Sequence, residues 1–315
     1  MLSVCICTHN PRMAVLALVI ESIARQSVPF DDISVIVVDN ASSPPLDNSV
    51  LDPLLQRGVP TKLIQEPTPG LQRARIAALR NTNSDWILWV DDDNELFPDF
   101  MQIGLDFIRS HPEVGCFGGK LHLPVTEKYE QWVAPFLPYL GIKDAGNTLL
   151  IEKVDHWTDA EPPGAGAWVH RKVLDAYLRR AEMDAVFFEL GRVGSRGLAS
   201  CDDSAMMRGA IRNDLACAYV PSLQLYHHID TEKRFNFKYL VRLMYAYGTS
   251  HVVLERMLNG SQPIPGYYLS RIKFLRLLLG VFRGASQKST AFGIGMMAYH
   301  IGMRSEYLRQ GQIKQ

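Results

Sequence analysis

The sequence shows no excess of either charge and no long hydrophobic run, and each absence excludes a class of protein. Its 33 Lys and Arg residues balance 33 Asp and Glu residues, so no net positive field attracts nucleic acid, and we expect no nucleic-acid partner. A membrane-spanning helix needs roughly 20 consecutive apolar residues, whereas the nearest candidates, 274–282 and 291–303, are interrupted by Arg276 and His300. The apolar stretch 14–20 is too short, and lacks the basic region before it, to predict a signal peptide.

Cysteine is scarce as well. The five cysteines are odd in number and lie mostly in apolar, strand-like segments, which favours a reducing compartment over a disulfide framework. Cys5, Cys7 and His9 do not have the spacing of a structural zinc site, in which paired ligands are usually separated by two or more residues. We therefore expect buried thiols and a cytoplasmic protein, with attachment at the inner face of the cytoplasmic membrane left open.

The first 120 residues instead contain alternating strand and helix patterns. Short runs rich in β-branched and aromatic residues predict strands at 2–7, 33–38, 61–65 and 86–90. Helical periodicity predicts helices at 12–26, 70–79 and 97–110, the first with Asn10 as a candidate N-cap. This order predicts an α/β fold with a mainly parallel, doubly wound sheet flanked by helices, followed by a mostly helical C-terminal region from residue 237.

Polar residues follow three of these strands at their carboxyl ends. The first strand leads into Thr8, His9 and Asn10, the second into Asp39 and Asn40, and the fourth into Asp91, Asp92 and Asp93. In doubly wound sheets, ligands bind outside the carboxyl ends of the strands. The three strand ends are therefore expected to form one crevice.

The three consecutive aspartates carry the strongest chemical signal. Carboxylates at the end of a buried strand repel one another and lose hydration unless a cation neutralises them. In an extended segment, Asp91 and Asp93 would point to the same side, where two oxygen ligands suit Mn²⁺ or Mg²⁺ and leave sites open for phosphate oxygens. The alternative is a solvated loop that caps the next helix.

An ordered set of motifs resembles glycosyltransferase family 2, which comprises nucleotide-sugar transferases of the GT-A fold. The match spans roughly residues 1–235, and the order of its members makes it more specific than any single motif. The matching segments are Val4–Asn10, Ile36–Ser42, Gly70–Arg75, Trp89–Asp93, Gly164–Gly166, Asp202–Asp203 and His227–His228. The sequence departs from the common pattern at three places, which are Ile76, Asp202 (commonly Glu) and Gly191-Arg192 (commonly Asp-Arg).

The resemblance implies a donor site made by the first half of the chain. Asp39 would accept a hydrogen bond from a uracil ring, although its position before Ser42 also suits a turn. Thr8 and Asn10 would line the nucleotide pocket, and Arg75 would lie near the charged part of the donor unless it belongs to a solvated helix face.

Further residues are implied to approach the sugar and the metal ion. Gly164 would let the backbone approach a sugar closely, and Asp92 would contact the ribose or the metal shell. Asp91 and Asp93 would bind Mn²⁺ or Mg²⁺. His228, in the His227-His228 pair, would complete the metal shell, and the alternative is a structural histidine pair at the end of a strand.

The same resemblance assigns the reaction itself to the second half. Inverting transfer needs a base that removes a proton from the acceptor hydroxyl. Asp203 is the candidate for this base, with Asp202 orienting it or the acceptor, and an N-cap of the following helix is the alternative for Asp203. The implied domains are a nucleotide-sugar-binding half at 1–120, an acceptor-binding and catalytic half at 121–235, and a helical extension at 236–315.

The resemblance thus predicts an inverting, metal-dependent, non-processive glycosyltransferase that uses a nucleotide-diphosphate sugar, with a UDP-sugar preferred. The acceptor would be a glycan or a lipid-linked glycan in cell-surface or exopolysaccharide synthesis. The Gln-x-x-Arg-Trp motif and the long membrane spans of processive synthases do not occur. Two alternatives remain, a nucleotidyltransferase and a non-catalytic nucleotide-binding scaffold, and the first is disfavoured because Thr8–Arg12 contains no glycine.

The segment 267–283 mixes basic and large apolar residues at helical spacing. Such a helix can lie in a membrane interface, and contact with the membrane would favour a lipid-linked acceptor. A helix packed on the rest of the protein shows the same pattern, so both interpretations stay open.

Overall fold

The computed structural model describes residues 1–183, 187–188, 190–191, 197–260, 263–287 and 289–311. The chain divides into two compact units. The first, which we call the sheet unit, comprises Met1–Pro124, Gly141–Met183 and Asp203–His228. The second, the helical unit, comprises Val125–Leu140, Asp184–Asp202 and Ile229–Gln315. Each unit is therefore built from segments that are distant in sequence, whereas the sequence suggested consecutive domains.

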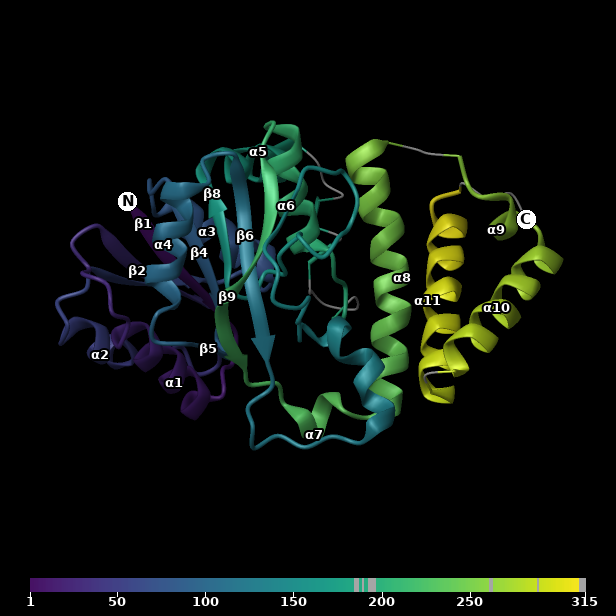
Figure 1. Cartoon of the computed structure of the whole chain (residues 1–315), viewed down its shortest axis with the longest axis horizontal. Helices are drawn as coiled ribbons and strands as arrows, with labels where there is room; N and C mark the ends of the chain where they lie inside the picture. The colour runs from purple at the N-terminus through teal and green to yellow at the C-terminus, as the bar shows by residue number, and fades with distance from the viewer. Residues whose placement is uncertain (184–186, 189, 192–196, 261–262, 288, 312–315) are drawn as a thin grey trace. The chain divides into compact units, whose positions relative to one another are not determined.

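The sheet unit is organised around a sheet with the strand order β3-β2-β1-β4-β8-β6-β9-β5, and β7 pairs with β9 (Figure 1). The pairs β3-β2, β2-β1, β1-β4 and β6-β9 are parallel, and the other pairs are antiparallel. The strands are β1 (Leu2–Thr8), β2 (Ile33–Asn40), β3 (Thr61–Glu66), β4 (Trp86–Asp91), β5 (Asn94–Leu96), β6 (Val114–His122), β7 (Leu150–Glu152), β8 (Ala167–His170) and β9 (Ala216–His227).

β1, β2 and β4 form because their apolar runs are buried, whereas β3 at the edge of the sheet is only partly buried. β1 and β2 are buried along nearly their whole length, as expected of parallel strands with helices on both faces. Their register places Thr8 beside Asp39 and Cys7 beside Asp91. The carboxyl ends of β1, β2 and β4 therefore meet at one edge of the sheet, as the sequence predicted.

The second half of the sheet depends on glycine. β6 contains Gly115, Gly118 and Gly119, and a Cβ added at Gly119 would lie 2.0 Å from the carbonyl oxygen of Leu223 on neighbouring β9. Only a residue without a side chain permits this approach of the two strands. The glycines that this approach requires also lower the strand propensity of the segment. For this reason, the sequence did not predict β6.

Helices of the sheet unit pack around this sheet. They are α1 (Met13–Ala24), α2 (Asp52–Leu55), α3 (Leu71–Arg80), α4 (Phe100–Ser110), α5 (Arg171–Met183), the 3₁₀-helix η1 (Asn48–Leu51) and α6 (Asp202–Arg212), whose first residue is grouped with the helical unit. The core of the unit joins the inner faces of α1 and α4 to the strands and includes Trp168, which is fully buried between Phe117 and Phe100. The expected α/β fold with a mostly parallel central sheet is confirmed.

The helical unit contains the 3₁₀-helix η2 (Gln131–Leu140) and the helices α7 (Thr231–Arg234), α8 (Phe237–Asn259), α9 (Gly266–Leu269), α10 (Arg271–Ser286) and α11 (Thr290–Arg309). α11 packs against both α8 and α10 and lies between them (Figure 1). Among the described residues, none of the helices combines the length and the apolar character that crossing a membrane requires.

Three local expectations were wrong. Asn10 does not cap α1, since Arg12 occupies the N-cap position and Asn10 has a left-handed φ of 49°. The acidic segment does not continue the strand, because β4 ends at Asp91 and Asp92-Asp93 form a turn into β5. The helix expected at 97–110 begins at Phe100, because residues 94–96 pair with β9 as β5.

Candidate functional site

The three aspartates form a tight acidic turn between β4 and β5, here defined as Asp91–Asp93. Asn94, which is fully buried, closes this turn. Its side-chain oxygen accepts a hydrogen bond from the Asp91 N–H at 3.0 Å, and its side-chain nitrogen donates to Asp93 at 3.3 Å. One neutral amide thus fixes the positions of two acidic residues, a role that the sequence analysis did not assign.

The two histidines at the end of β9 face different carboxylates. The ring Nε2 of His227 lies 3.3 Å from Oδ1 of Asp93, and the ring Nε2 of His228 lies 2.7 Å from Oε2 of Glu95. The antiparallel register, which pairs Asn94 with His227, explains the difference, because successive side chains of a strand point to opposite faces. The structure therefore turns the ring of His227, rather than that of the expected His228, toward a carboxylate of the acidic turn.

The tautomer of His227 follows from its second contact. Its Nδ1 lies 3.2 Å from the carbonyl oxygen of Gly141. A carbonyl oxygen can only accept, so Nδ1 carries the proton. Nε2 faces Asp93 and then has two possible states. Either its lone pair binds a cation that Asp93 also binds, or it carries a proton and forms an ion pair with Asp93. Metal-binding histidines commonly donate their other N–H to a backbone carbonyl in this way.

Asp92 lies on the side of the turn that faces β1. Its Oδ2 accepts a hydrogen bond from the Thr8 hydroxyl at 2.5 Å. Burial raises the pKa of Asp92 to about 6; the Thr8 hydroxyl and the nearby Arg12 oppose this shift, and the carboxylates of Asp93 and Asp91 add to it. Thr8 is therefore a contact of the acidic turn, and the charged form of Asp92 is disfavoured chiefly by burial.

Arg12 is a basic residue that lies beside the acidic turn. Its guanidinium donates a hydrogen bond to the carbonyl oxygen of His228, and the N–H of His228 donates to the carbonyl oxygen of Asp93 at 2.8 Å. These bonds connect the start of α1, the end of β9 and the acidic turn. Arg12 was assigned no role from the sequence, although it lies two residues after the motif Thr8–Asn10.

Asn10 and Asp39 organise the loop that follows β2. The Asn10 N–H donates to the Ser42 hydroxyl and its side-chain oxygen accepts from the Ser43 N–H, both at 2.8 Å. Asp39 is fully buried and accepts backbone hydrogen bonds from Ser42 at 3.2 Å and Leu46 at 2.8 Å. Burial alone would raise the pKa of Asp39, but these hydrogen bonds and that of Gln65 outweigh it and lower the pKa. The turn-forming role of Asp39 is thus visible in the structure, and its contact with a uracil ring stays a prediction.

Asp203, Gly164 and Arg75 lie together at a second cluster. The Gly164 N–H donates to Oδ2 of Asp203 at 3.1 Å, and the Ser204 N–H donates to Oδ1 at 3.0 Å. A Cβ added at Gly164 would lie 2.5 Å from Nη2 of Arg75, so the guanidinium packs directly against the glycine. Arg75 is buried and stacks over the ring of Trp89, 5.7 Å from its centroid.

The structure locates Asp202 but only part of the segment around Gly191-Arg192. Asp202 is the first residue of α6 and is buried, so Asp203 lies inside the first helical turn rather than before it. Residues 192–196, which include Arg192, lie outside the described residues.

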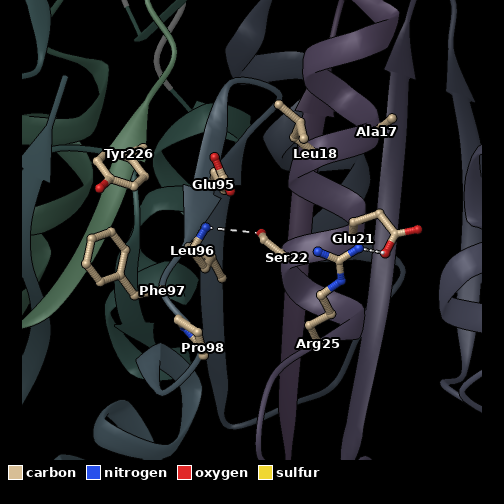
Figure 2. A pocket seen from close by; sticks show the side chains of 10 residues that line it. All are labelled: Ala17, Leu18, Glu21, Ser22, Arg25, Glu95, Leu96, Phe97, Pro98 and Tyr226. Carbon is tan, nitrogen blue, oxygen red and sulfur yellow. Dashed lines mark hydrogen bonds and ion pairs between the residues drawn. The ribbon is translucent and has the colours of Figure 1, made fainter. Parts of the chain in front are cut away.

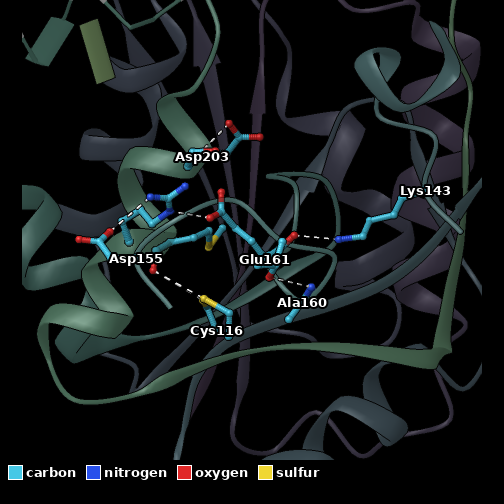
Figure 3. Close-up of polar contacts among 11 residues, drawn as sticks. Cys116, Lys143, Asp155, Ala160, Glu161 and Asp203 are labelled. Atoms are coloured by element: carbon cyan, nitrogen blue, oxygen red, sulfur yellow. Dashed lines mark hydrogen bonds and ion pairs between the residues drawn. The ribbon is translucent and has the colours of Figure 1, made fainter. Parts of the chain in front are cut away.

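A buried ion pair lies beneath Asp203 (Figure 3). Nε of Arg208, on α6, donates to Oε2 of Glu161 at 2.7 Å, and the two side chains are only 3% and 4% exposed. Arg208 also contacts Asp155 at 3.3 Å. Lys143 donates to the Glu161 carbonyl oxygen at 2.8 Å, which fixes the backbone just before Pro162–Gly164. None of these residues was predicted, because an isolated Glu or Arg in a sequence carries no sign of its partner.

The acidic turn offers only part of the ligand set that a divalent cation needs. No group of three or more His, Cys, Asp or Glu side chains within the described chain is arranged to bind a metal by itself. Asp93 and His227 nevertheless offer one oxygen and one imidazole nitrogen 3.3 Å apart. Adjacent ligands of an octahedral ion with bonds near 2.1 Å lie roughly 3 Å apart, so this pair suits Mn²⁺ or Mg²⁺ with other positions left for phosphate oxygens.

A pocket of about 390 Å³ opens between α1 and the segment after β5 (Figure 2). Glu95, the partner of His228, belongs to its lining. The other lining residues are largely apolar and include Leu18, Phe97 and Tyr226. None of the site residues expected from the sequence lines this pocket, so it gives no support to the donor site.

The sheet and its flanking helices define an α/β protein with acidic residues at the carboxyl ends of β2 and β4, and comparison with known proteins specifies its family. The profile of glycosyl transferase family 2 matches residues 3–178, which is more than half of the chain. The chain therefore belongs to glycosyl transferase family 2. The glycosyltransferase class and the GT-A fold, both expected from the sequence motifs, are confirmed at the level of the family.

Individual relatives are distant. An uncharacterized glycosyltransferase of Haemophilus influenzae is 32% identical over 102 residues, which are 32% of this chain and 37% of that protein. The mannosyltransferase PcManGT of Pyrobaculum calidifontis, in complex with GDP-Man and Mn²⁺, is 15% identical with a TM-score of 0.56, covering 98% of this chain and 87% of that one. S. aureus TarS 1–349 with UDP-GlcNAc is 15% identical with a TM-score of 0.50, covering 98% and 92%. The chain thus spans little more than a third of its curated relative, and the solved structures support the fold alone.

Proposed function

We propose that this protein transfers a sugar, with inversion, from a UDP-sugar to a hydroxyl group of a glycan or lipid-linked acceptor, and that it adds single sugars. The observation that carries the proposal is the contact between Asp93 and His227 in the acidic turn. It provides two ligands for a divalent cation at the carboxyl edge of the sheet, where nucleotides bind in folds of this type.

Asp203 is the proposed base. One of its carboxylate oxygens accepts from the Gly164 N–H and the other from the Ser204 N–H. Two such bonds orient the carboxylate, and a carboxylate placed in this way can accept a proton. As the acceptor oxygen attacks the anomeric carbon, its proton passes to Asp203 while the bond to the nucleoside diphosphate breaks.

Asp93 and His227 would bind Mn²⁺ or Mg²⁺, with Asp91 and Asp92 adding negative charge around them. The bound ion would supply Lewis-acid stabilisation of the negative charge on the departing diphosphate. Arg75 is the proposed cationic neighbour of the donor at the second cluster, where it packs on Gly164. Asn10 and Asp39 would shape the nucleotide pocket through the loop they anchor, and Asp202 would help to orient Asp203.

The proposed setting is the cytoplasm, with the acceptor presented at the inner face of the cytoplasmic membrane for cell-surface or exopolysaccharide synthesis. None of the five cysteines, all of which the structure describes, forms a disulfide, and the sulfur atoms of Cys116 and Cys217 lie at a hydrogen-bond distance of 3.3 Å in the core. This agrees with a reducing compartment.

Donor hydrolysis and transfer assays with a panel of UDP-sugars and GDP-mannose, with and without Mn²⁺, test the proposal. The wild type should release UDP only with the ion present, and Asp93→Ala and Asp203→Asn should each lose turnover. The matched control is Asp31→Asn. Asp31 is an exposed acidic residue on a turn and is far in sequence from the acidic turn. Full turnover in both site variants would remove this mechanism, and pyrophosphate release from a nucleoside triphosphate would indicate a nucleotidyltransferase instead.

A further inference from the structure

The charges of the chain are unevenly distributed near its C-terminus. Residues 256–305 contain seven Lys and Arg residues and no Asp or Glu, although the whole chain has 33 of each kind. The rest of the chain therefore carries 26 basic and 33 acidic residues. A neutral protein thus contains a long basic segment, and α10 lies in the middle of it.

α10 is apolar on two opposite sides. Its inner side packs through Phe274 and Leu277 against the cluster around Tyr268, and Leu278 is buried. Its outer side exposes Ile272, Leu275 and Leu279, whose side chains are 68%, 58% and 48% accessible. The helix is already held by its inner side, so the outer apolar residues are not required for its packing.

The outer residues form a stripe beside basic side chains. Ile272, Leu275 and Leu279 share one face because they are spaced three, four and seven residues apart. Arg276 and Arg283 follow next around the helix, and both are exposed. Leu269 on the adjoining α9 is also exposed, and within its unit α10 packs on α11, which lies between it and α8 (Figure 1).

We propose that this stripe, defined as Ile272, Leu275, Leu279, Arg276 and Arg283, binds the surface of a membrane that contains anionic lipids. An amphipathic helix of this kind lies in the interface with its apolar side chains below the headgroups and its basic ones among them. The described helices do not qualify as spans, which leaves contact parallel to the surface as the mode of binding.

The charges favour a lipid surface over a second copy of the protein. A symmetric dimer would bring the same face of both copies together, so Arg276 and Arg283 would oppose identical cations with no carboxylate between residues 256 and 305 to offset them. Anionic headgroups offer the complementary charge, at about 1 kcal/mol for each basic residue near the surface.

Co-sedimentation of the full-length protein with vesicles tests the inference. The wild type should bind vesicles of phosphatidylcholine with phosphatidylglycerol, bind much less to phosphatidylcholine alone, and release as salt is raised. Arg276→Gln with Arg283→Gln should weaken binding to the anionic vesicles by about 30-fold. Ile272→Ser with Leu275→Ser and Leu279→Ser should weaken it by at least about tenfold.

Leu55→Ser and Arg57→Gln, exposed residues of the sheet unit, are the matched controls and should bind as the wild type does. Circular dichroism should show that every variant keeps its helices, since the substituted side chains are exposed. Failure of the wild type to bind anionic vesicles, or unchanged binding by both stripe variants, would overturn the inference. A dimer of the wild type that the apolar variant dissociates would assign the stripe to a second copy instead.

The inference stands apart from the proposed chemistry. Asp203→Asn should bind vesicles like the wild type, and the stripe variants should keep UDP-sugar hydrolysis, because no residue of the stripe belongs to the catalytic machinery. Failure of the wild type to bind anionic vesicles despite full turnover would therefore refute only the membrane contact, and vesicle binding by a wild type without turnover would refute only the proposed reaction.

Discussion

Two acidic regions of the sheet unit differ in how the protein compensates their charge. Glu161 shares a buried guanidinium with Asp155, at 2.7 Å from Arg208. The acidic turn is contacted instead by a hydroxyl, an amide and an imidazole, from Thr8, Asn94 and His227. A full positive charge fixed against a buried carboxylate serves the fold, whereas at the acidic turn hydrogen-bonding partners orient the carboxylates and Arg12 acts on Asp92 from nearby.

The largest effect, a loss of stability, is expected at the buried ion pair between Arg208 and Glu161. Arg208→Met leaves Glu161 as a buried charge without its guanidinium, which should lower the free energy of unfolding by about 3–5 kcal/mol. Urea denaturation of the purified variant measures the loss. The double variant Arg208→Met with Glu161→Gln should recover much of it, and Arg57→Met is the exposed control. A loss below about 1 kcal/mol would show that the pair does not stabilise the sheet unit.

Asp203, the proposed base, should be the next most sensitive position. Its substitution should lower the rate of the reaction rather than the stability of the protein. Asp203→Asn keeps an oxygen for the Gly164 N–H but cannot accept the acceptor proton, so kcat should fall about 10²–10⁴-fold. The donor KM should change little. Steady-state kinetics with Asp31→Asn as control measure both parameters, and a variant that retains its kcat would exclude Asp203 as the base.

The two histidines give a sharper test because they are adjacent in sequence. His227→Gln removes the ring that faces Asp93, and the Mn²⁺ concentration needed for half-maximal activity should rise at least about tenfold. His228→Gln removes a contact with Glu95 and should leave the requirement for Mn²⁺ nearly unchanged. If the metal dependence follows His228 instead, the sequence-based choice of ligand was right and the arrangement described here is not the metal-bound one.

The smallest effect is expected at Gly164. A Cβ at this position would meet Nη2 of Arg75 at 2.5 Å, and the end of this side chain can move aside at a cost of about 1 kcal/mol. Gly164→Ala should therefore raise the donor KM severalfold while the free energy of unfolding falls only slightly. Gly266→Ala, where an added Cβ meets nothing within 4 Å, is the control. An unchanged KM would show that the donor does not bind at the cluster formed by Arg75, Gly164 and Asp203.

The sequence predicted the parts of the fold that depend on neighbouring residues. β1, β2, β3 and β4 are short apolar runs, and the polar residues that follow β1, β2 and β4 identify one edge of the sheet. β5 and β6 escaped prediction for different reasons, since β5 has three residues and depends on pairing with distant β9, and β6 is rich in glycine.

Contacts between residues that are distant in sequence also limited the prediction of the site. The sequence located the acidic turn, Asp203 and Gly164 as one set of motifs. It could not decide between His227 and His228, because only the register of β9 against β5 shows which ring reaches Asp93. Nor could it reveal Arg208, whose partner Glu161 is 47 residues away. Contacts of this kind depend on tertiary structure and have no local signature.

The most direct test is an anomalous difference map from crystals grown with UDP and Mn²⁺, recorded near the manganese absorption edge. The central claim is that Asp93 and His227 together bind the ion that stabilises the departing diphosphate. A peak within bonding distance of both side chains and of the diphosphate is the predicted result. A map that shows UDP in the crevice and no manganese peak beside Asp93 would contradict it.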